Sequence, residues 1–137
     1  MPKHAFSHVD TWVFDLDNTL YPPSARLFDQ IEVRMTRWVM DTLGVDHARA
    51  NYLRKHYWHT YGTTLAGLMR EHSVDPAPYL HDVHDISFDV LTPDPVLADR
   101  IRALPGRRII YTNGTAPYAE RVAAARGLDG LFDAIYG

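Results

Sequence analysis

The sequence predicts an α/β fold: a Rossmann-like parallel sheet, incomplete at about three strands, with an inserted all-helical segment. Three observations support this fold class. Short β-favouring runs occupy residues 11–14, 108–111 and 132–136; helical patterns separate them; and the longest helical stretch directly follows the first run. Strands that alternate with helices in this way are expected to be parallel, with right-handed crossovers between them.

The expected domain organisation follows from this order of elements. Residues 1–21 and 94–137 should form one discontinuous α/β core, and residues 22–93 a helical cap domain inserted into it. Helix starts and ends inside the insertion are marked by capping residues and glycines. The expected limits are Ser24 and Gly44 for the first helix, Asp46 and Gly62 for the second, residues 65–72 for the third, and Asp75-Pro76 for the start of the fourth.

The second half of the core contains two further helices. One begins at Asp94-Pro95 and is stopped by Pro105-Gly106. Its inward positions are expected to be Val96, Leu97, Ile101 and Leu104. The other follows the middle strand and has Pro117 in its first turn, where a missing N–H costs nothing. Together these helices provide the crossovers between the three strands.

Composition narrows the function classes. The chain has 137 residues, a formal charge of −3 and no cysteine. The near-neutral charge gives no reason to expect binding to nucleic acid polymers or to an anionic membrane. No signal peptide and no apolar run of membrane-spanning length is recognisable, and the absence of cysteine excludes thiol catalysis. We expect a cytoplasmic protein.

Two carboxylates follow the first predicted strand. Asp15 and Asp17 are separated by one residue in the segment Asp-Leu-Asp-Asn-Thr-Leu. Magnesium prefers hard oxygen ligands, and a carboxylate can also attack phosphorus to give an aspartyl-phosphate. The second carboxylate could then serve as general acid and base. A helix cap and a turn residue are the structural alternative for this pair.

A hydroxyl and an amide follow the middle strand. Thr112 and Asn113 precede Gly114 and the start of the next helix, where backbone N–H groups favour an anion. Ligands of open α/β sheets bind at the carboxyl ends of the strands, so these residues should meet Asp15 there. Asn113-Gly114 is also a strong hairpin signal, but a helical pattern follows it rather than an alternating strand.

These motifs resemble those of the haloacid dehalogenase-like superfamily. The resemblance implies that Asp15 is the nucleophile and Asp17 the general acid/base, that Mg²⁺ is held by Asp15 and the backbone carbonyl of Asp17, and that Thr112 and Asn113 bind the transferring phosphoryl group. The aspartate at position 17 resembles the residue that the phosphatase and phosphomutase branches of this superfamily carry at the second acidic position of the motif. The implied ligand is a small phosphorylated metabolite.

The insertion adds a more specific resemblance. Residues 57–68 are similar to the cap of the pyrimidine 5′-nucleotidase branch, which implies a nucleoside 5′-monophosphate, preferably a pyrimidine, as substrate. The implied contacts on the substrate side are Tyr61, Thr64 and Gly67. Packing within the cap is the alternative for this aromatic stripe. His56 with His59, and His81 with His84, share helical spacing, and packing or solvated roles are favoured for them over a metal site.

Two later motifs of the superfamily have no counterpart here. The chain has two lysines, Lys3 and Lys55, and neither follows Thr112; its last acidic residues form no adjacent pair. The resemblance therefore covers about the first three fifths of a typical member. We expect a truncated chain, such as a proteolysed or truncated gene product, that is inactive alone. Its exposed sheet edge at residues 12–14 should either mediate self-association or be covered by an unusual packing. The alternatives are a catalytically silent fragment that binds phosphate or a partner, and a phosphoglycolate-type capped phosphatase.

Overall fold

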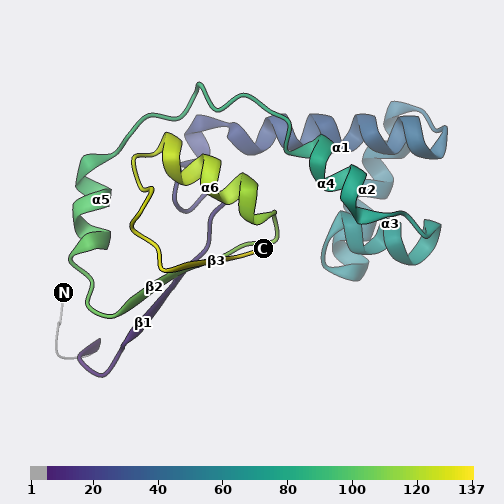
Figure 1. The fold of residues 1–137 in the computed structure, drawn as a ribbon. Coiled ribbons are helices and arrows are strands. Elements are labelled where there is room, and N and C mark those ends of the chain that lie inside the picture. The colour runs from purple at the N-terminus through teal and green to yellow at the C-terminus, as the bar shows by residue number, and fades with distance from the viewer. Residues whose placement is uncertain (1–5) are drawn as a thin grey trace. The chain divides into compact units, whose positions relative to one another are not determined.

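The three strands form one parallel sheet, which confirms the predicted α/β fold. A computed structural model describes residues 6–137; residues 1–5, part of the expected core segment, lie outside the described residues. Strands β1 (Thr11–Phe14), β2 (Arg107–Tyr111) and β3 (Ala134–Tyr136) lie in the order β1-β2-β3 (Figure 1). Ile110, on the central strand, is fully buried. The third strand begins two residues later than residue 132, which the sequence suggested, and Phe132 instead packs edge-on against Phe14.

The chain divides into two compact units. The sheet unit consists of the described residues up to Leu27 together with Ser87–Gly137, and the helical unit is Phe28–Ile86. The predicted insertion, residues 22–93, encloses the helical unit with a few residues to spare at each end. No helix among residues 6–137 combines the length and hydropathy needed to cross a membrane.

Four helices account for the insertion: α1 (Leu27–Leu43), α2 (His47–Tyr61), α3 (Thr64–His72) and α4 (Pro76–Val83). Asp46 and Asp75 cap α2 and α4 as predicted, through side-chain bonds from the N–H groups of Arg49 and Ala77. The prediction for Ser24 is wrong. It lies within a short 3₁₀ helix, Pro23–Ala25, and the left-handed backbone of Arg26 (φ 55°) separates that turn from α1.

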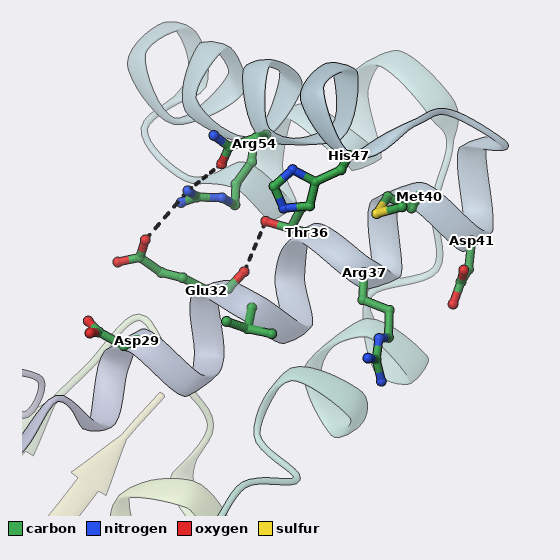
Figure 2. Close-up of a pocket in the computed structure, with 10 residues that line it drawn as sticks. Asp29, Glu32, Thr36, Arg37, Met40, Asp41, His47 and Arg54 are labelled. Carbon is green, nitrogen blue, oxygen red and sulfur yellow. Dashed lines mark hydrogen bonds and ion pairs between the residues drawn. The ribbon is translucent and has the colours of Figure 1, made fainter.

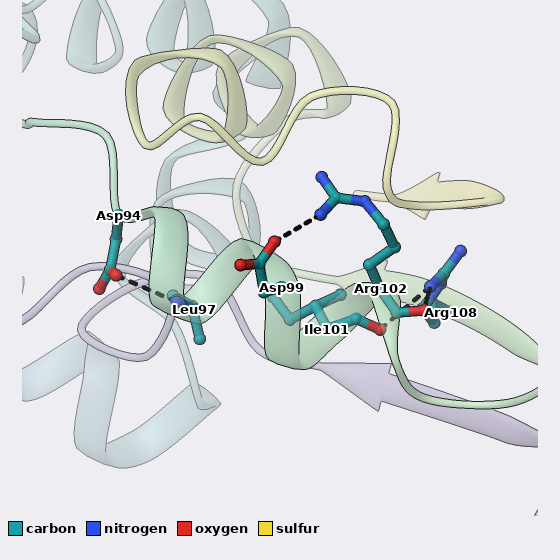
Figure 3. Close-up of polar contacts among 6 residues, drawn as sticks. All are labelled: Asp94, Leu97, Asp99, Ile101, Arg102 and Arg108. Atoms are coloured by element: carbon teal, nitrogen blue, oxygen red, sulfur yellow. Dashed lines mark hydrogen bonds and ion pairs between the residues drawn. The ribbon is translucent and has the colours of Figure 1, made fainter.

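Helix α5 (Pro95–Arg102) is capped by Asp94, whose Oδ1 accepts from the N–H of Leu97 at 3.0 Å (Figure 3). Its buried residues are Ala98 and Ile101, whereas Val96 is 62% exposed. The prediction of an inward Val96 is therefore wrong: Ala98 and Ile101, three apart, define the buried stripe, and position 96 lies well off it. The guanidinium of Arg108 donates to the carbonyls of Ile101 and Arg102 (Figure 3), which ties the end of α5 to β2.

Helix α6 (Ala116–Ala125) packs along β3 and is capped by Thr115. It starts two residues after Gly114, so the hairpin alternative for Asn113-Gly114 is excluded. The buried side of α6 carries Tyr118, Ala119, Val122 and Ala123.

A buried arginine joins the two places where the insertion leaves and re-enters the sheet unit. Arg126 follows α6 and is only 9% exposed. Its Nε donates to the carbonyl of Leu20 (3.0 Å), one terminal nitrogen donates to the carbonyl of Thr92 (2.7 Å), and the other pairs with Asp94 (3.2 Å). We call these four residues the Arg126 clamp. All four residues belong to the sheet unit, so the clamp joins the two chain segments of that unit without any residue of the helical unit.

Strand β1 lies at an edge of the sheet. By register, Val13 shares a sheet face with Tyr111 and Tyr136, and the three side chains are 62%, 63% and 49% exposed. Parallel sheets are normally covered on both faces, and an apolar edge strand is a template for pairing with another chain. The predicted edge is therefore present. Self-association through it stays a prediction.

Val13→Lys should weaken this self-association. A charged side chain on an edge strand opposes strand pairing between two chains. Light scattering across a concentration series is expected to show association of the unmodified chain and a smaller average mass for the variant. Val33→Lys, at a comparably exposed valine of α1 (65%), is the matched control and should leave the association unchanged. A monomeric unmodified chain at high concentration would contradict the prediction.

Candidate active site

The loop after β1 exposes its polar residues because its apolar residues are anchored. Leu16 and Leu20 are buried at 0% and 2% exposure, and the N–H groups of Thr19 and Leu20 both donate to the carbonyl of Leu16. Asn18 adopts the left-handed conformation (φ 56°), which asparagine tolerates better than most residues. The sequence therefore folds into a tight turn with Asp15 and Thr19 on its outer surface.

One hydroxyl lies between the two oxygens that the family resemblance implies as magnesium ligands. Thr19 Oγ1 lies 3.2 Å from Asp15 Oδ2, to which it donates, and 3.4 Å from the backbone carbonyl of Asp17. The exposed carboxylate of Asp15 and the carbonyl of Asp17 therefore flank the same small space. The Thr19 hydroxyl also restricts rotation of the Asp15 carboxylate.

Asp17 is held differently, by two phenols. The hydroxyls of Tyr21 and Tyr118 donate to Asp17 Oδ1 at 2.8 and 2.7 Å. Tyr21 follows in the same loop, whereas Tyr118 lies on α6, 101 positions away. Burial, followed by the negative charge of Asp17, raises the pKa of both tyrosines well above the usual value of 10, so both stay protonated donors.

The loop after β2 begins at the same edge of the sheet. Phe14 pairs with Ile110, so β1 and β2 are neighbouring parallel strands, which lie about 4.8 Å apart. Asp15 and Thr112 follow the carboxyl ends of these two strands. Thr112 is buried; its N–H donates to the carbonyl of Tyr136, and its hydroxyl accepts from the N–H of Gly114 at 3.0 Å. The hydroxyl keeps its own proton to donate. Asn113 is exposed.

The donor set fits Mg²⁺ better than zinc. A carboxylate and a backbone carbonyl are hard oxygen ligands, and Mg²⁺ completes its octahedron with waters and substrate phosphate. Among residues 6–137, no group of three or more His, Cys, Asp or Glu side chains could hold a metal. The loop that carries the Asp15 carboxylate and the Asp17 carbonyl stays a predicted magnesium site.

All three predicted substrate contacts in the helical unit have neighbours within that unit. The buried hydroxyl of Thr64 donates to the carbonyl of Arg54 at 2.9 Å, which joins α3 to α2. A Cβ at Gly67 would lie 2.2 Å from the Cβ of Tyr57, so the space at this glycine is filled by α2. Tyr61 is half-buried, and its hydroxyl donates to Glu71.

Gly67→Ala should destabilise the helical unit. The added methyl group has to displace Tyr57 or separate α2 from α3, and overpacking of this kind typically costs about 1–3 kcal/mol. The expected result is a lower midpoint of thermal unfolding measured by circular dichroism. An unchanged midpoint together with weaker binding of a phosphorylated ligand would contradict the packing role and favour a substrate contact.

The pair His56 and His59 lies in aromatic packing. His56 stacks on Tyr52 with ring centroids 5.6 Å apart, and His59 meets Trp58 edge-on. In the same unit, a hollow of about 670 Å³ lies beside α1 and α2 (Figure 2). Two residues that line this hollow form an ion pair, Arg54 with Glu32 at 3.4 Å (Figure 2). Arg54 also donates a hydrogen bond to the side chain of Asn51 at 2.8 Å.

Sequence reasoning missed Thr19, Tyr21, Tyr118 and Arg126. The first two lie in the motif loop itself, four residues after Asp15 and Asp17, so their spacing carried a usable signal. For Tyr118 and Arg126, the partners lie 101 and 106 positions away, and only the fold reveals them.

Comparison with known proteins gives a distant match to a curated protein. No family model matches the chain. It is 27% identical over 132 residues to Phosphate metabolism protein 8 of Saccharomyces cerevisiae, an alignment that covers 89% of this chain and 41% of that protein. The chain thus spans about two fifths of the length of this curated relative.

Proposed function

We propose that this chain carries the nucleophile and the phosphate-holding groups of a magnesium-dependent phosphomonoester hydrolase of the haloacid dehalogenase-like type. One observation carries the proposal: Asp15, Asp17 and Thr112 gather at the carboxyl edge of one sheet, with Asp17 bonded to the helix that follows Thr112. The similarity to a yeast protein named for phosphate metabolism supports it.

The proposed reaction has two steps. In the first, a carboxylate oxygen of Asp15 bonds to phosphorus, the ester P–O bond breaks, and Asp17 gives a proton to the leaving oxygen. In the second, a water oxygen bonds to phosphorus, the Asp15–phosphorus bond breaks, and Asp17 takes a proton from the water. Thr112 and the exposed Asn113 donate to the phosphoryl oxygens. Mg²⁺, bound by Asp15 and the carbonyl of Asp17, would neutralise charge on the phosphoryl group.

For the substrate we propose a nucleoside 5′-monophosphate, with a pyrimidine preferred. The support is the resemblance of residues 57–68 and the half-buried aromatic ring of Tyr61 at the end of α2. Such a ring can stack on a base. Expected ligands are therefore small phosphorylated metabolites in a cytoplasmic setting.

A catalytically silent, phosphate-binding chain is the second candidate. The observation in its favour is the sequence after Thr112, which contains neither a lysine nor an adjacent acidic pair. Each missing group would remove several kcal/mol of transition-state stabilisation. On this view the chain binds phosphate but does not turn over.

Binding of beryllofluoride, which mimics the phosphoryl group of an aspartyl-phosphate, together with hydrolysis assays distinguishes the phosphomonoester hydrolase from the silent, phosphate-binding chain. We expect Mg²⁺-dependent beryllofluoride binding to the 137-residue chain by ¹⁹F NMR, and hydrolysis of a panel of phosphate esters by the full-length protein, meaning the longest form that its gene encodes. Beryllofluoride binding by the chain, without hydrolysis by the chain or by the full-length protein, would establish the silent alternative. The absence of both would overturn the proposal.

A further inference from the structure

Two buried tyrosines converge on one oxygen of Asp17. Tyr21 and Tyr118 are 1% and 2% exposed, and both hydroxyls reach Oδ1 at hydrogen-bond distance. They come from separate elements, the loop after β1 and the first turns of α6. A carboxylate oxygen has two lone pairs, so these two donors satisfy Oδ1 completely.

The two tyrosines are themselves fixed in place. Tyr118 is the third residue of α6, and its N–H donates to the capping hydroxyl of Thr115 at 3.3 Å, so the start of the helix sets its position. Its ring also packs against Phe88, with the two ring centroids 6.0 Å apart. The guanidinium of Arg121 lies over the Phe88 ring, 4.5 Å from its centroid. Tyr21 directly follows the buried Leu20 and is itself almost completely buried.

We propose that Tyr21 and Tyr118 are positioning residues that fix the Asp17 carboxylate so that only Oδ2 exchanges protons with the reacting oxygens. This inference rests on the proposed function. Proton transfer needs a donor held within a few tenths of an ångström of its productive position, and two bonds to Oδ1 prevent rotation of the carboxylate about Cβ–Cγ. Because Tyr118 belongs to α6, the same contact couples the acid/base group to the helix behind the phosphate-binding loop.

The competing explanation is purely structural: two buried phenols need an acceptor, and Asp17 supplies one. The dependence on the leaving group distinguishes the two. An alkyl phosphate needs its leaving oxygen protonated, whereas p-nitrophenolate leaves readily without a proton. A displaced Asp17 should therefore slow hydrolysis of the alkyl ester selectively, while a general loss of structure slows both esters equally.

The test compares kcat/KM of the full-length protein with its Tyr118→Phe and Tyr21→Phe variants on an alkyl phosphate and on p-nitrophenyl phosphate. The ratio kcat/KM reports the steps up to the first phosphoryl transfer. We expect at least about a tenfold loss on the alkyl ester and a much smaller loss on p-nitrophenyl phosphate. Mg²⁺-dependent beryllofluoride binding, which needs Asp15, should persist in both variants.

Tyr79→Phe is the matched control. Tyr79 is also buried, and it packs edge-on against Trp38 in the helical unit, so its variant should leave both kcat/KM values unchanged. Equal losses on the two esters in the Tyr21 and Tyr118 variants, or no loss on either, would overturn the inference while leaving the proposed function in place. A full-length protein that hydrolyses neither ester and binds no beryllofluoride would overturn both.

Discussion

Asp15→Asn should abolish phosphate-ester hydrolysis by the full-length protein, with kcat/KM falling by at least about 10³-fold. The amide has nearly the shape of the carboxylate but is a far poorer nucleophile for phosphorus, and it removes one negative charge from the proposed magnesium site. The Thr19 hydroxyl can still donate to the amide oxygen, so the loop should keep its geometry. Steady-state hydrolysis with Mg²⁺ measures the loss.

Asp129→Asn is the control for this experiment. Asp129 is exposed in the turn after α6, and the same chemical change there should leave kcat/KM unaltered. Beryllofluoride binding should disappear in the Asp15 variant and persist in the Asp129 variant. Residual hydrolysis near the unmodified rate in Asp15→Asn would show that another group is the nucleophile.

Arg126→Met should cause the largest loss of stability, about 3 kcal/mol. The substitution keeps much of the aliphatic volume but leaves the carbonyls of Leu20 and Thr92, and the carboxylate of Asp94, without their cationic partner. In a chain of this length, such a loss lowers the midpoint of thermal unfolding by roughly 10 °C. Chemical denaturation of the 137-residue chain measures the free energy directly.

Arg102→Met provides the comparison. Arg102 pairs with Asp99 at 2.7 Å on the surface of α5 (Figure 3), with its side chain 58% exposed. Exposed ion pairs contribute less than about 1 kcal/mol, so this variant should unfold close to the unmodified chain. An equally small decrease in the free energy of unfolding for both arginine variants would show that the Arg126 clamp contributes little to stability.

Local signals predicted most of the fold. Asp46, Asp75 and Asp94 cap the helices expected of them, because a side-chain oxygen next to a helix start satisfies a backbone N–H wherever it occurs. Errors arose where tertiary packing decides. Val96 looked inward by composition, but the rotation of α5 against the sheet unit buries Ala98 and Ile101 instead.

The candidate site was predicted to a similar extent. The residues directly after each strand, Asp15 and Thr112, could be placed at one edge because parallel strands share a direction. The tyrosines that hold Asp17 could not, since burial and a partner far along the chain define their role. The packing partners of Thr64 and Gly67 on α2 were likewise not predicted, because only the fold places the two helices against each other, and the role of both residues as substrate contacts stays a prediction.

The Arg126 clamp has a consequence for how the chain tolerates change in length. By joining Leu20 to Thr92, it closes a long loop from within the sheet unit. The entropy of closing a flexible loop grows only with the logarithm of its length, about 0.6 kcal/mol for each doubling. Insertions, deletions or a wholly different segment between these two anchor points should therefore cost the sheet unit little.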